Sequence, residues 1–399
     1  MTAPAETADR PHRPTSPVTF FLLALAAGAG AGNLYYTQPL LPLIAPDIGL
    51  DESIGSLVVT LGQIGYILGL LLVVPLGDIV ENRRLIASIL ILAAAGLLLA
   101  FFAPTAPLFL AAALMFGVGS VVAQVAVPFA AHLAAPEERG RRVGSVVSGL
   151  MTGILLARPV ASMIAHWFGW HAVFGLAAAV MLVLAVGLRL TLPERHPHTR
   201  TGYFALVGSL PGLWRATPVL RRRAAYQAAM FATFILFWTA VPLLLTGAPF
   251  RLDQQGLALF ALAGAASVVI SPVAGRIADR GWSRAGTVGA FVLAIGGFLA
   301  TLWGAQVESL GILVAGAVVL DLAVTANLVL GQRALFMLAP ELRARLNGLY
   351  IAVFFFGGAF GSAIASPLFE SHGWPAVTAA ALVMLIAAFL YFLTERRGL

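Results

Sequence analysis

Long apolar runs dominate this sequence and limit what the chain can fold into. An α-helix needs about 20 apolar residues to cross a lipid bilayer. Runs of this kind lie near 18–44, 54–76, 85–103, 107–132, 143–166, 170–191, 224–246, 255–276, 286–304, 309–337, 345–369 and 373–394. Only 10% of the residues are charged, whereas a soluble globular domain carries about 25%. We therefore predict an integral membrane protein with twelve transmembrane helices.

The arginines test this number of spans. All 24 basic residues are arginine, and 22 of them fall in cytoplasmic segments or at cytoplasmic helix ends if the N-terminus is cytoplasmic. Of the other two, Arg251 lies outside and Arg158 lies within a span. Cytoplasmic loops carry an excess of basic residues, so we predict a multi-pass protein with both termini in the cytoplasm. The net charge of +7 then faces anionic lipid headgroups, and no nucleic-acid partner is expected.

The sequence also repeats itself at an offset of 204 residues, for example from Gly169-Trp170 to Gly373-Trp374. At the same offset, Ala-Pro-Glu-Glu-Arg-Gly-Arg at 135–141 corresponds to Ala-Pro-Glu-Leu-Arg-Ala-Arg at 339–345. We predict two related six-helix bundles that enclose a central cavity. The predicted parts are a disordered cytoplasmic tail (1–17), an N-terminal bundle (18–191), a cytoplasmic linker (192–222), a C-terminal bundle (223–394) and a cytoplasmic C-tail (395–399).

Two loops carry a motif that resembles the loop signature of the major facilitator superfamily, Gly-x-Leu-Ala-Asp-Arg-x-Gly-Arg-Arg. The loop after the second span reads Leu-Gly-Asp-Ile-Val-Glu-Asn-Arg-Arg at 76–84, and the loop after the eighth reads Gly-Arg-Ile-Ala-Asp-Arg-Gly at 275–281. The run Asn-Leu-Tyr-Tyr-Thr-Gln-Pro-Leu-Leu at 33–41 resembles a bacterial subset of the drug:proton antiporter branch. The resemblance covers 18–394. It implies the all-α major facilitator fold, the bacterial inner (plasma) membrane, no cofactor and a monomer.

In that family the two loops hold the cytoplasmic side shut when the protein faces outward. The resemblance therefore implies a cytoplasmic gate made of Asp78, Arg83, Arg84, Asp279 and Arg280. The two aspartates can cap neighbouring helix N-termini and pair with nearby arginines. The alternative is that these charges only fix the helix ends in the membrane.

Two charged residues, Arg158 and Asp321, lie deep within predicted spans. A charge at a helix centre costs about 2.5–3.5 kcal/mol on insertion scales, so such residues usually mark function. The family template implies that their helices belong to opposite halves and face the interface between them. We hypothesise that the two residues meet or compete at this interface. Asp321 would take up and release a proton, and Arg158 would lower the pKa of Asp321 when it is close. Two alternatives stay open: Arg158 binds an anionic substrate, or the two residues form a fixed ion pair.

Polar and aromatic residues of the inner helices mark the candidate substrate cavity. On the tenth span, Asp321, Thr325 and Gln332 fall on one helix face by their spacing. The resemblance implies that the first, fourth, seventh and tenth spans line the cavity. The predicted cavity residues are Asn33, Tyr36, Gln38, Gln63, Tyr66, Ser120, Gln124, Trp238, Thr325 and Gln332. Each of them alone could instead form a hydrogen bond between helices.

No motif of enzyme chemistry is present in the sequence. It has no cysteine and no His-Glu-x-x-His, Walker or Gly-x-Ser-x-Gly motif, so we predict no enzyme and no metal site. The leading hypothesis is a secondary active transporter that exports a small, partly apolar compound against proton entry. The alternatives are uptake or facilitated transport of a small organic anion and, third, a non-transporting receptor or scaffold. The expected partners are a small-molecule substrate, protons and the lipid bilayer.

Overall fold

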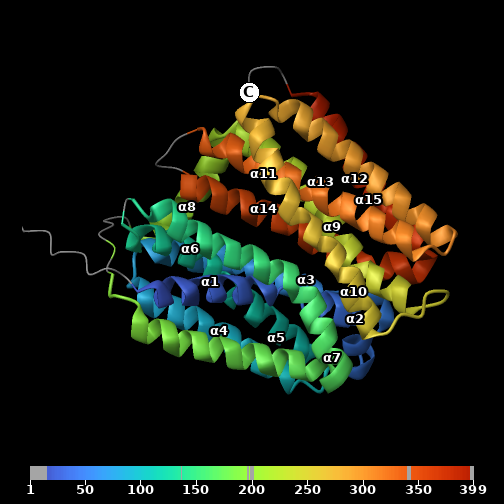
Figure 1. Ribbon diagram of the computed structural model, residues 1–399, viewed down its shortest axis with the longest axis horizontal. Coiled ribbons are helices and arrows are strands. Elements are labelled where there is room, and N and C mark those ends of the chain that lie inside the picture. Colours follow the sequence, from blue (N-terminus) through green and yellow to red (C-terminus); the bar gives the residue numbers. More distant parts are fainter. Residues whose placement is uncertain (1–15, 136, 196, 198–201, 339–342, 396–399) are drawn as a thin grey trace, which may run out of the picture.

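The computed structural model describes residues 16–135, 137–195, 197, 202–338 and 343–395, and contains no strand within them. Figure 1 shows two groups of roughly parallel helices that lie against each other. One group is formed by the chain up to α7, and the other by the chain from α9 onward. The all-α architecture of two helical bundles is therefore confirmed.

The helices of the first group are α1 (Pro17–Gly32), α2 (Thr37–Asp47), α3 (Leu57–Leu68), α4 (Asn82–Phe101), α5 (Ala106–Gly119), α6 (Val122–Leu133) and α7 (Arg139–Thr191), with short helices η1 (Glu52–Ile54), η2 (Gly69–Val73) and η3 (Val74–Asp78). Those of the second group are α9 (Pro218–Thr246), α10 (Gln254–Ala261), η4 (Leu262–Ala265), α11 (Ala266–Asp279), α12 (Ser283–Gln306), α13 (Leu310–Phe336), α14 (Arg343–Ala363) and α15 (Ala365–Leu393).

These helices account for the predicted spans. Among the described residues, nine helices are long and apolar enough to cross a membrane, or ten if the bent pair α1–α2 counts as one span. One of the nine is the 53-residue α7, which contains two spans that meet at Gly169. Helices α10, η4 and α11 follow one another directly and lie where the eighth span, near 255–276, is predicted.

The internal repeat of the sequence is also a repeat of the backbone. Gly169 and Gly373 have φ angles of +80° and +66°, and each breaks an otherwise continuous helix. This left-handed region suits glycine, which has no Cβ. The two glycines occupy equivalent positions at the 204-residue offset, so the same device turns the chain into the last span of each half. The other repeated motif includes 136 and 339–342, which lie outside the described residues.

Small residues let equivalent helices approach closely in both halves. A Cβ added at Gly153 of α7 would overlap the backbone of Gly28 in α1. At the equivalent position in α14, a Cβ at Gly357 would overlap the backbone of Ala228 in α9. Small residues at such contacts allow van der Waals packing of the two backbones, which is a main source of helix association in membranes.

Replacing Gly153 with leucine is therefore expected to separate α1 from α7 and to destabilise the protein by at least about 1–3 kcal/mol. Gly144 lies on the same helix, where a Cβ would meet only open space, so Gly144→Leu is the matched control. Thermal unfolding of the purified variants in detergent measures the difference. Equal midpoints for the two variants would contradict the packing argument.

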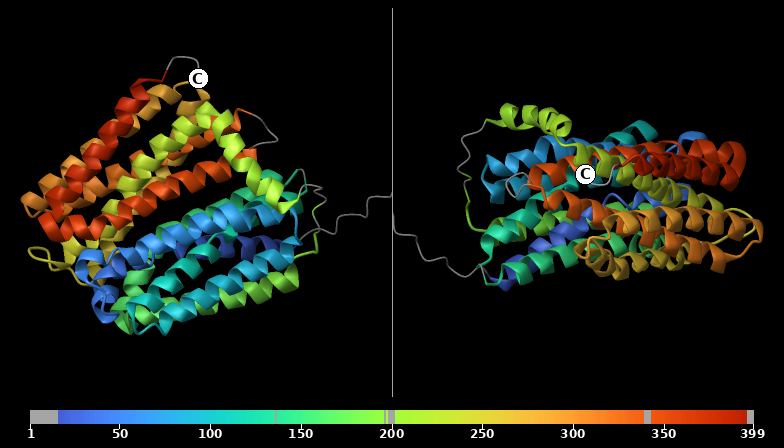
Figure 2. Two further views of the ribbon diagram at one scale, coloured as in Figure 1. Left: turned by 180° about the vertical axis from the view of Figure 1, so that it is seen from behind. Right: turned by 90° about the horizontal axis from the view of Figure 1, so that it is seen from above.

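A further helix, α8 (Tyr203–Ala216), lies within 192–222, the stretch predicted to be the linker. Figure 2 shows it at one end of the molecule, next to both groups of helices. The hydroxyl of Tyr203 donates a hydrogen bond to the carbonyl of Leu72 at 2.8 Å, so α8 is attached to the first group. We call this end the cytoplasmic end, following the arginine distribution, and the opposite end the outer end.

Candidate functional site

Arg158 lies at the contact between the two halves, with only 5% of its surface exposed. Its Nε donates a hydrogen bond to Oε1 of Gln38 at 2.7 Å. Its guanidinium carbon lies 4.5 Å from the ring centre of Trp238, 4.7 Å from that of Tyr35 and 5.4 Å from that of Phe234. Three aromatic faces and one amide thus hold the charge within the membrane, where cation–π contacts are strong. Its Nη2 has no hydrogen-bond partner.

Asp321 lies in α13, in the opposite half, and is 3% exposed. Its Oδ1 accepts a hydrogen bond from Nε1 of Trp238 at 3.0 Å. Among the ion pairs of the described residues, none joins Arg158 to Asp321. The two charged residues instead contact the same indole. A direct ion pair stays a prediction, because no such pair joins the two residues in this conformation.

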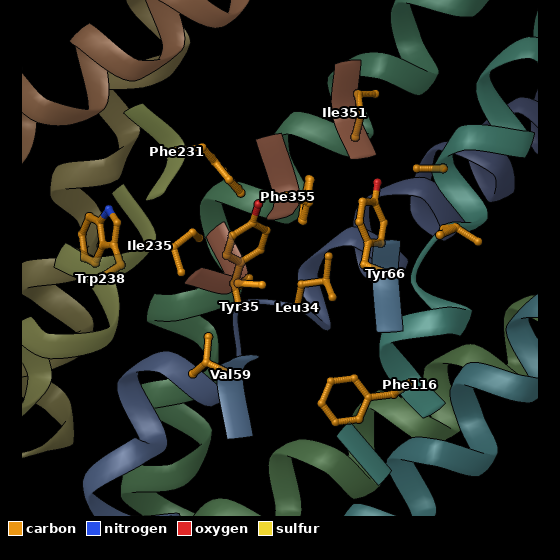
Figure 3. Close-up of a cluster of buried hydrophobic side chains, with 14 of the residues drawn as sticks. Leu34, Tyr35, Val59, Tyr66, Phe116, Phe231, Ile235, Trp238, Ile351 and Phe355 are labelled. Carbon is orange, nitrogen blue, oxygen red and sulfur yellow. The ribbon is translucent and has the colours of Figure 1, made fainter. Parts of the chain in front are cut away.

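Tyr66 and Gln124, two other predicted cavity residues, bind each other. Nε2 of Gln124 donates to the hydroxyl of Tyr66 at 3.1 Å. The Tyr66 ring lies 4.3 Å, centre to centre, from Phe355, whose ring lies 4.9 Å from Phe231. Figure 3 shows these rings close to Tyr35 in the core between the halves. Aromatic contacts between α3, α14 and α9 therefore join the two halves near mid-membrane.

The remaining predicted cavity residues are spread over several environments. Asn33 donates to Sδ of Met181 at 3.7 Å, and Ser120 donates to the carbonyl of Phe116 at 2.8 Å. Near the cytoplasmic end, Gln332 donates to Asn347 at 3.3 Å. Gln63 is fully buried and neither of its amide atoms has a partner. Thr325 is half-buried. Tyr36 lines a groove between α1 and α7.

A cavity of about 200 Å³ opens between the halves at the cytoplasmic end. The first half contributes Leu70, Asp78 and Gln124, and the start of α14 contributes Arg345 and Asn347. Leu206 and Leu210 of α8 also line it. Gln124, which lines this cavity, binds Tyr66, so the aromatic contacts described above begin next to the cavity wall.

Hydroxyl groups close the outer end. The backbone N–H of Ser56 donates to Oγ of Ser366 at 3.0 Å, and the N–H of Ser366 donates back to Oγ of Ser56 at 3.3 Å. One turn deeper, the hydroxyls of Thr60 and Ser362 lie 3.0 Å apart. These contacts join α3 of one half to α14 and α15 of the other. These contacts hold the halves together at the outer end. A second cavity, of about 310 Å³, lies beside them and is lined by Pro42 of one half and Thr246 of the other.

The predicted gate residues do not connect the two halves in this conformation. Arg83 pairs with Glu194, which lies just after α7, and Asp279 pairs with Arg333 in the second half. Asp78 is exposed at the cavity wall, and Arg280 is exposed as well. A gate of this kind would be open here, in agreement with the cavity beside it.

Helix α4 is capped by Glu81, and not by Asp78 as the loop motif suggests. The carboxylate of Glu81 accepts the backbone N–H groups of Arg83 at 2.8 Å and Arg84 at 3.0 Å. The physical reason is position: Glu81 directly precedes the first turn of the helix, where free N–H groups point at it. Asp78 lies further upstream, at the end of η3.

The repeated Ala-Pro-Glu motif also forms contacts within one half. Glu138 pairs with Arg141 and Arg142 at the start of α7. The hydrogen bond from Arg142 lowers the pKa of Glu138, and the charge of Arg141 acts in the same direction. This carboxylate therefore stays ionised at neutral pH.

Sequence reasoning missed Tyr35 and Phe234, which contact Arg158, and the buried hydrogen bond from Asn327 to Gln227 at 2.7 Å. The prediction named Tyr36 and not Tyr35, because spacing alone does not show which of two adjacent tyrosines faces the other half. Asn327 offered a signal, as an amide within an apolar span.

Comparisons with known proteins agree with this architecture. A family model described as Major Facilitator Superfamily matches residues 20–307 and 229–398. The uncharacterized transporter YgaY of Escherichia coli O157:H7 is 37% identical, over 96% of each chain. The probable transporter SCO4007 of Streptomyces coelicolor is 36% identical, over 92% of this chain and 84% of that protein.

More distant proteins are also similar to this chain. The chloramphenicol resistance protein of Streptomyces lividans is 26% identical, over 66% of this chain and 67% of that protein. Among solved structures, the nucleoside transporter NupG superposes with a TM-score of 0.75 at 15% identity, covering 94% of this chain and 99% of that one. At this identity the likeness concerns the fold alone.

Proposed function

Because the chain belongs to the Major Facilitator Superfamily, we propose that it is a proton-coupled secondary transporter that works by alternating access. The observation that carries this proposal is Asp321, a carboxylate that is buried between the halves and accepts a hydrogen bond from Trp238. Buried ionisable groups in membrane proteins commonly take part in proton relays. We place the protein in the bacterial inner membrane, as a monomer with both termini in the cytoplasm.

The two ends of the molecule support alternating access. The outer end is held by hydroxyl groups and backbone N–H groups, of which Ser56 and Ser366 are one pair. Such polar contacts in membrane proteins average only about 0.6 kcal/mol each, so they can be exchanged for others at little cost. At the cytoplasmic end, Asp78 and Arg345 line opposite sides of the cavity. We propose that the predicted gate residues close this end when the outer end opens.

Protonation of Asp321 supplies the coupling in this scheme. A nearby guanidinium favours an ionised carboxylate, and its removal favours the protonated acid. Arg158 belongs to the opposite half, so a rocking motion of the halves changes its distance from Asp321. The proton is therefore taken up in one conformation and released in the other.

We propose that the substrate is a small, partly apolar compound that leaves the cell in exchange for protons. The cytoplasmic cavity carries apolar side chains such as Leu70, Val74 and Leu349 beside the amide of Gln124, which suits a compound with both apolar and polar parts. The printed name of the Streptomyces lividans relative, a chloramphenicol resistance protein, supports export.

A second candidate, transport of a small organic anion, is favoured by one observation. Nη2 of Arg158 and Nε2 of Gln38 are buried donors without partners. They lie next to each other, because Nε of the same guanidinium binds Oε1 of the same amide. Free N–H groups on one edge of a guanidinium suit a carboxylate.

Transport in proteoliposomes with an imposed pH gradient tests both candidates. The compounds to be tested are chloramphenicol, a cationic dye and benzoate, with proton flux followed by a pH-sensitive dye inside the vesicles. The proposal expects at least one compound to move together with, or in exchange for, protons. Benzoate as the only transported compound would favour the second candidate. Substrate movement without any proton flux would contradict proton coupling.

A further inference from the structure

One side chain, Trp238, contacts both buried charges. It is 1% exposed, and Figure 3 shows its indole in the core between the halves. Its ring faces the guanidinium of Arg158 at 4.5 Å, and its Nε1 donates to Oδ1 of Asp321 at 3.0 Å. Trp238 lies in α9, in the same half as Asp321. The hydrogen bond is thus internal to one half, whereas the ring contact crosses to the other.

The surroundings of Trp238 limit how it can move. The rings of Phe237, Phe260 and Phe234 pack around the indole with centre distances of 5.3, 6.0 and 6.5 Å. The hydrogen bond to Asp321 therefore fixes which way the N–H points, and the aromatic neighbours fix the plane of the ring. Both are needed to keep the ring face on Arg158.

Gly264 also lies close to the carboxylate of Asp321. A Cβ at position 264 would lie 2.9 Å from Oδ2 of Asp321. A larger residue than glycine would therefore clash with this oxygen. Among the described residues, the titratable groups that act on Asp321 from neighbouring elements are Arg158 of α7 and Tyr35 between α1 and α2. Of these contacts, the one through Trp238 is a hydrogen bond to the carboxylate itself.

We propose that Trp238 is a positioning residue that couples the protonation of Asp321 to the contact between the halves at Arg158. An ionised carboxylate is about twice as strong an acceptor as a neutral group. Protonation therefore weakens the bond that orients the indole, and the ring loses its fixed position on the guanidinium. The contact between the halves is then released. The inference rests on the proposed role of Asp321 as the proton-carrying group.

The natural lack of cysteine gives a direct test. Val59 is 1% exposed near the outer end of α3, so Val59→Cys reacts with an impermeant maleimide only when the outer end opens. Its rate in right-side-out vesicles is measured at about pH 5 and pH 8. Each rate is divided by that of the exposed Ile54→Cys, which removes the pH dependence of the thiol itself.

In the Val59→Cys background, the normalised rate is expected to change at least about fivefold between the two pH values. Trp238→Phe keeps an aromatic face for Arg158 but loses the N–H donor, and is expected to remove this pH dependence. Trp374→Phe is the matched control, because Trp374 is also buried and its N–H has no partner. It is expected to keep the pH dependence.

The outcomes separate the two proposals. If Trp238→Phe keeps the fivefold change while Asp321→Asn loses it, the role of Trp238 is wrong and that of Asp321 stands. If Asp321→Asn keeps the change, the proton-carrying role itself fails. Loss of the change in both variants, with Trp374→Phe unaffected, supports the coupling role of Trp238.

Discussion

Asp321→Asn is expected to lower the proton-coupled transport rate by about 10- to 100-fold, which corresponds to an increase in activation free energy of about 1.4–2.7 kcal/mol. Asparagine has nearly the same size, and its carbonyl oxygen can still accept the N–H of Trp238. It cannot take up or release a proton, so the fold is kept and the coupling is lost. The measurement is proton flux and substrate flux in proteoliposomes at several pH values.

Glu308→Gln, which removes an exposed carboxylate just before the same helix, is the control and should keep coupled transport. Asp321→Asn is predicted to bind substrate but to move no protons. A binding measurement alone therefore cannot test the prediction. Full proton-coupled activity of Asp321→Asn across the pH range would show that another group carries the proton.

Arg158→Gln is the second change with a large expected effect. Removing one member of a buried pair of charges costs about 3–5 kcal/mol, because the other charge is left without compensation. Since no ion pair joins Arg158 to Asp321 in this conformation, we expect the lower end of this range. The free energy of unfolding should fall, and the transport rate with it.

The double variant Arg158→Gln with Asp321→Asn separates charge compensation from packing. It removes both charges, so thermal stability should recover most of the loss while transport stays absent. Thermal unfolding in detergent of the two variants and the wild type gives the comparison. A double variant no more stable than Arg158→Gln alone would show that Arg158 acts through its aromatic packing and not through its charge.

The fold could be predicted from the sequence because its main determinants are local. Apolar runs and arginine positions define the spans, and the matching positions of Gly169 and Gly373 reveal the repeat in the sequence itself. The breaks within spans could not be foreseen in the same way. The bend of 48° between α1 and α2, for example, depends on how both pieces pack on other helices.

The candidate site could be predicted only as a set of residues. Charge within an apolar span singled out Arg158 and Asp321, and Trp238 was among the predicted cavity residues. That the indole joins the two charges depends on side-chain directions from three helices, which the sequence does not encode locally. For the same reason, adjacent Tyr35 and Tyr36 could not be told apart. The contacts made by the outer-end hydroxyls were missed because single hydroxyls in a span usually bond their own helix.

The 204-residue offset shows where the two halves have diverged. Arg158 corresponds to Ser362. Both lie at contacts between the halves, but Ser362 bonds Thr60 at 3.0 Å while Arg158 bonds Gln38 and stacks on Trp238. At Ser362 the contact between the halves is made by neutral hydroxyls. At Arg158 it is made by a charged side chain whose neighbour Trp238 binds the carboxylate of Asp321. We infer that protonation acts on the second contact, and that the first opens with it.

The central claim, that protonation of Asp321 drives alternate opening of the two ends, is tested most directly by distances between paired spin labels. One pair, on Asp51→Cys and Arg251→Cys, spans the outer end; the other, on Val80→Cys and Trp282→Cys, spans the cytoplasmic end, and all four positions are exposed. The account predicts that between about pH 5 and pH 8 one distance lengthens as the other shortens, and that Asp321→Asn abolishes both changes. Distances that stay constant with pH, or that lengthen together, would contradict it.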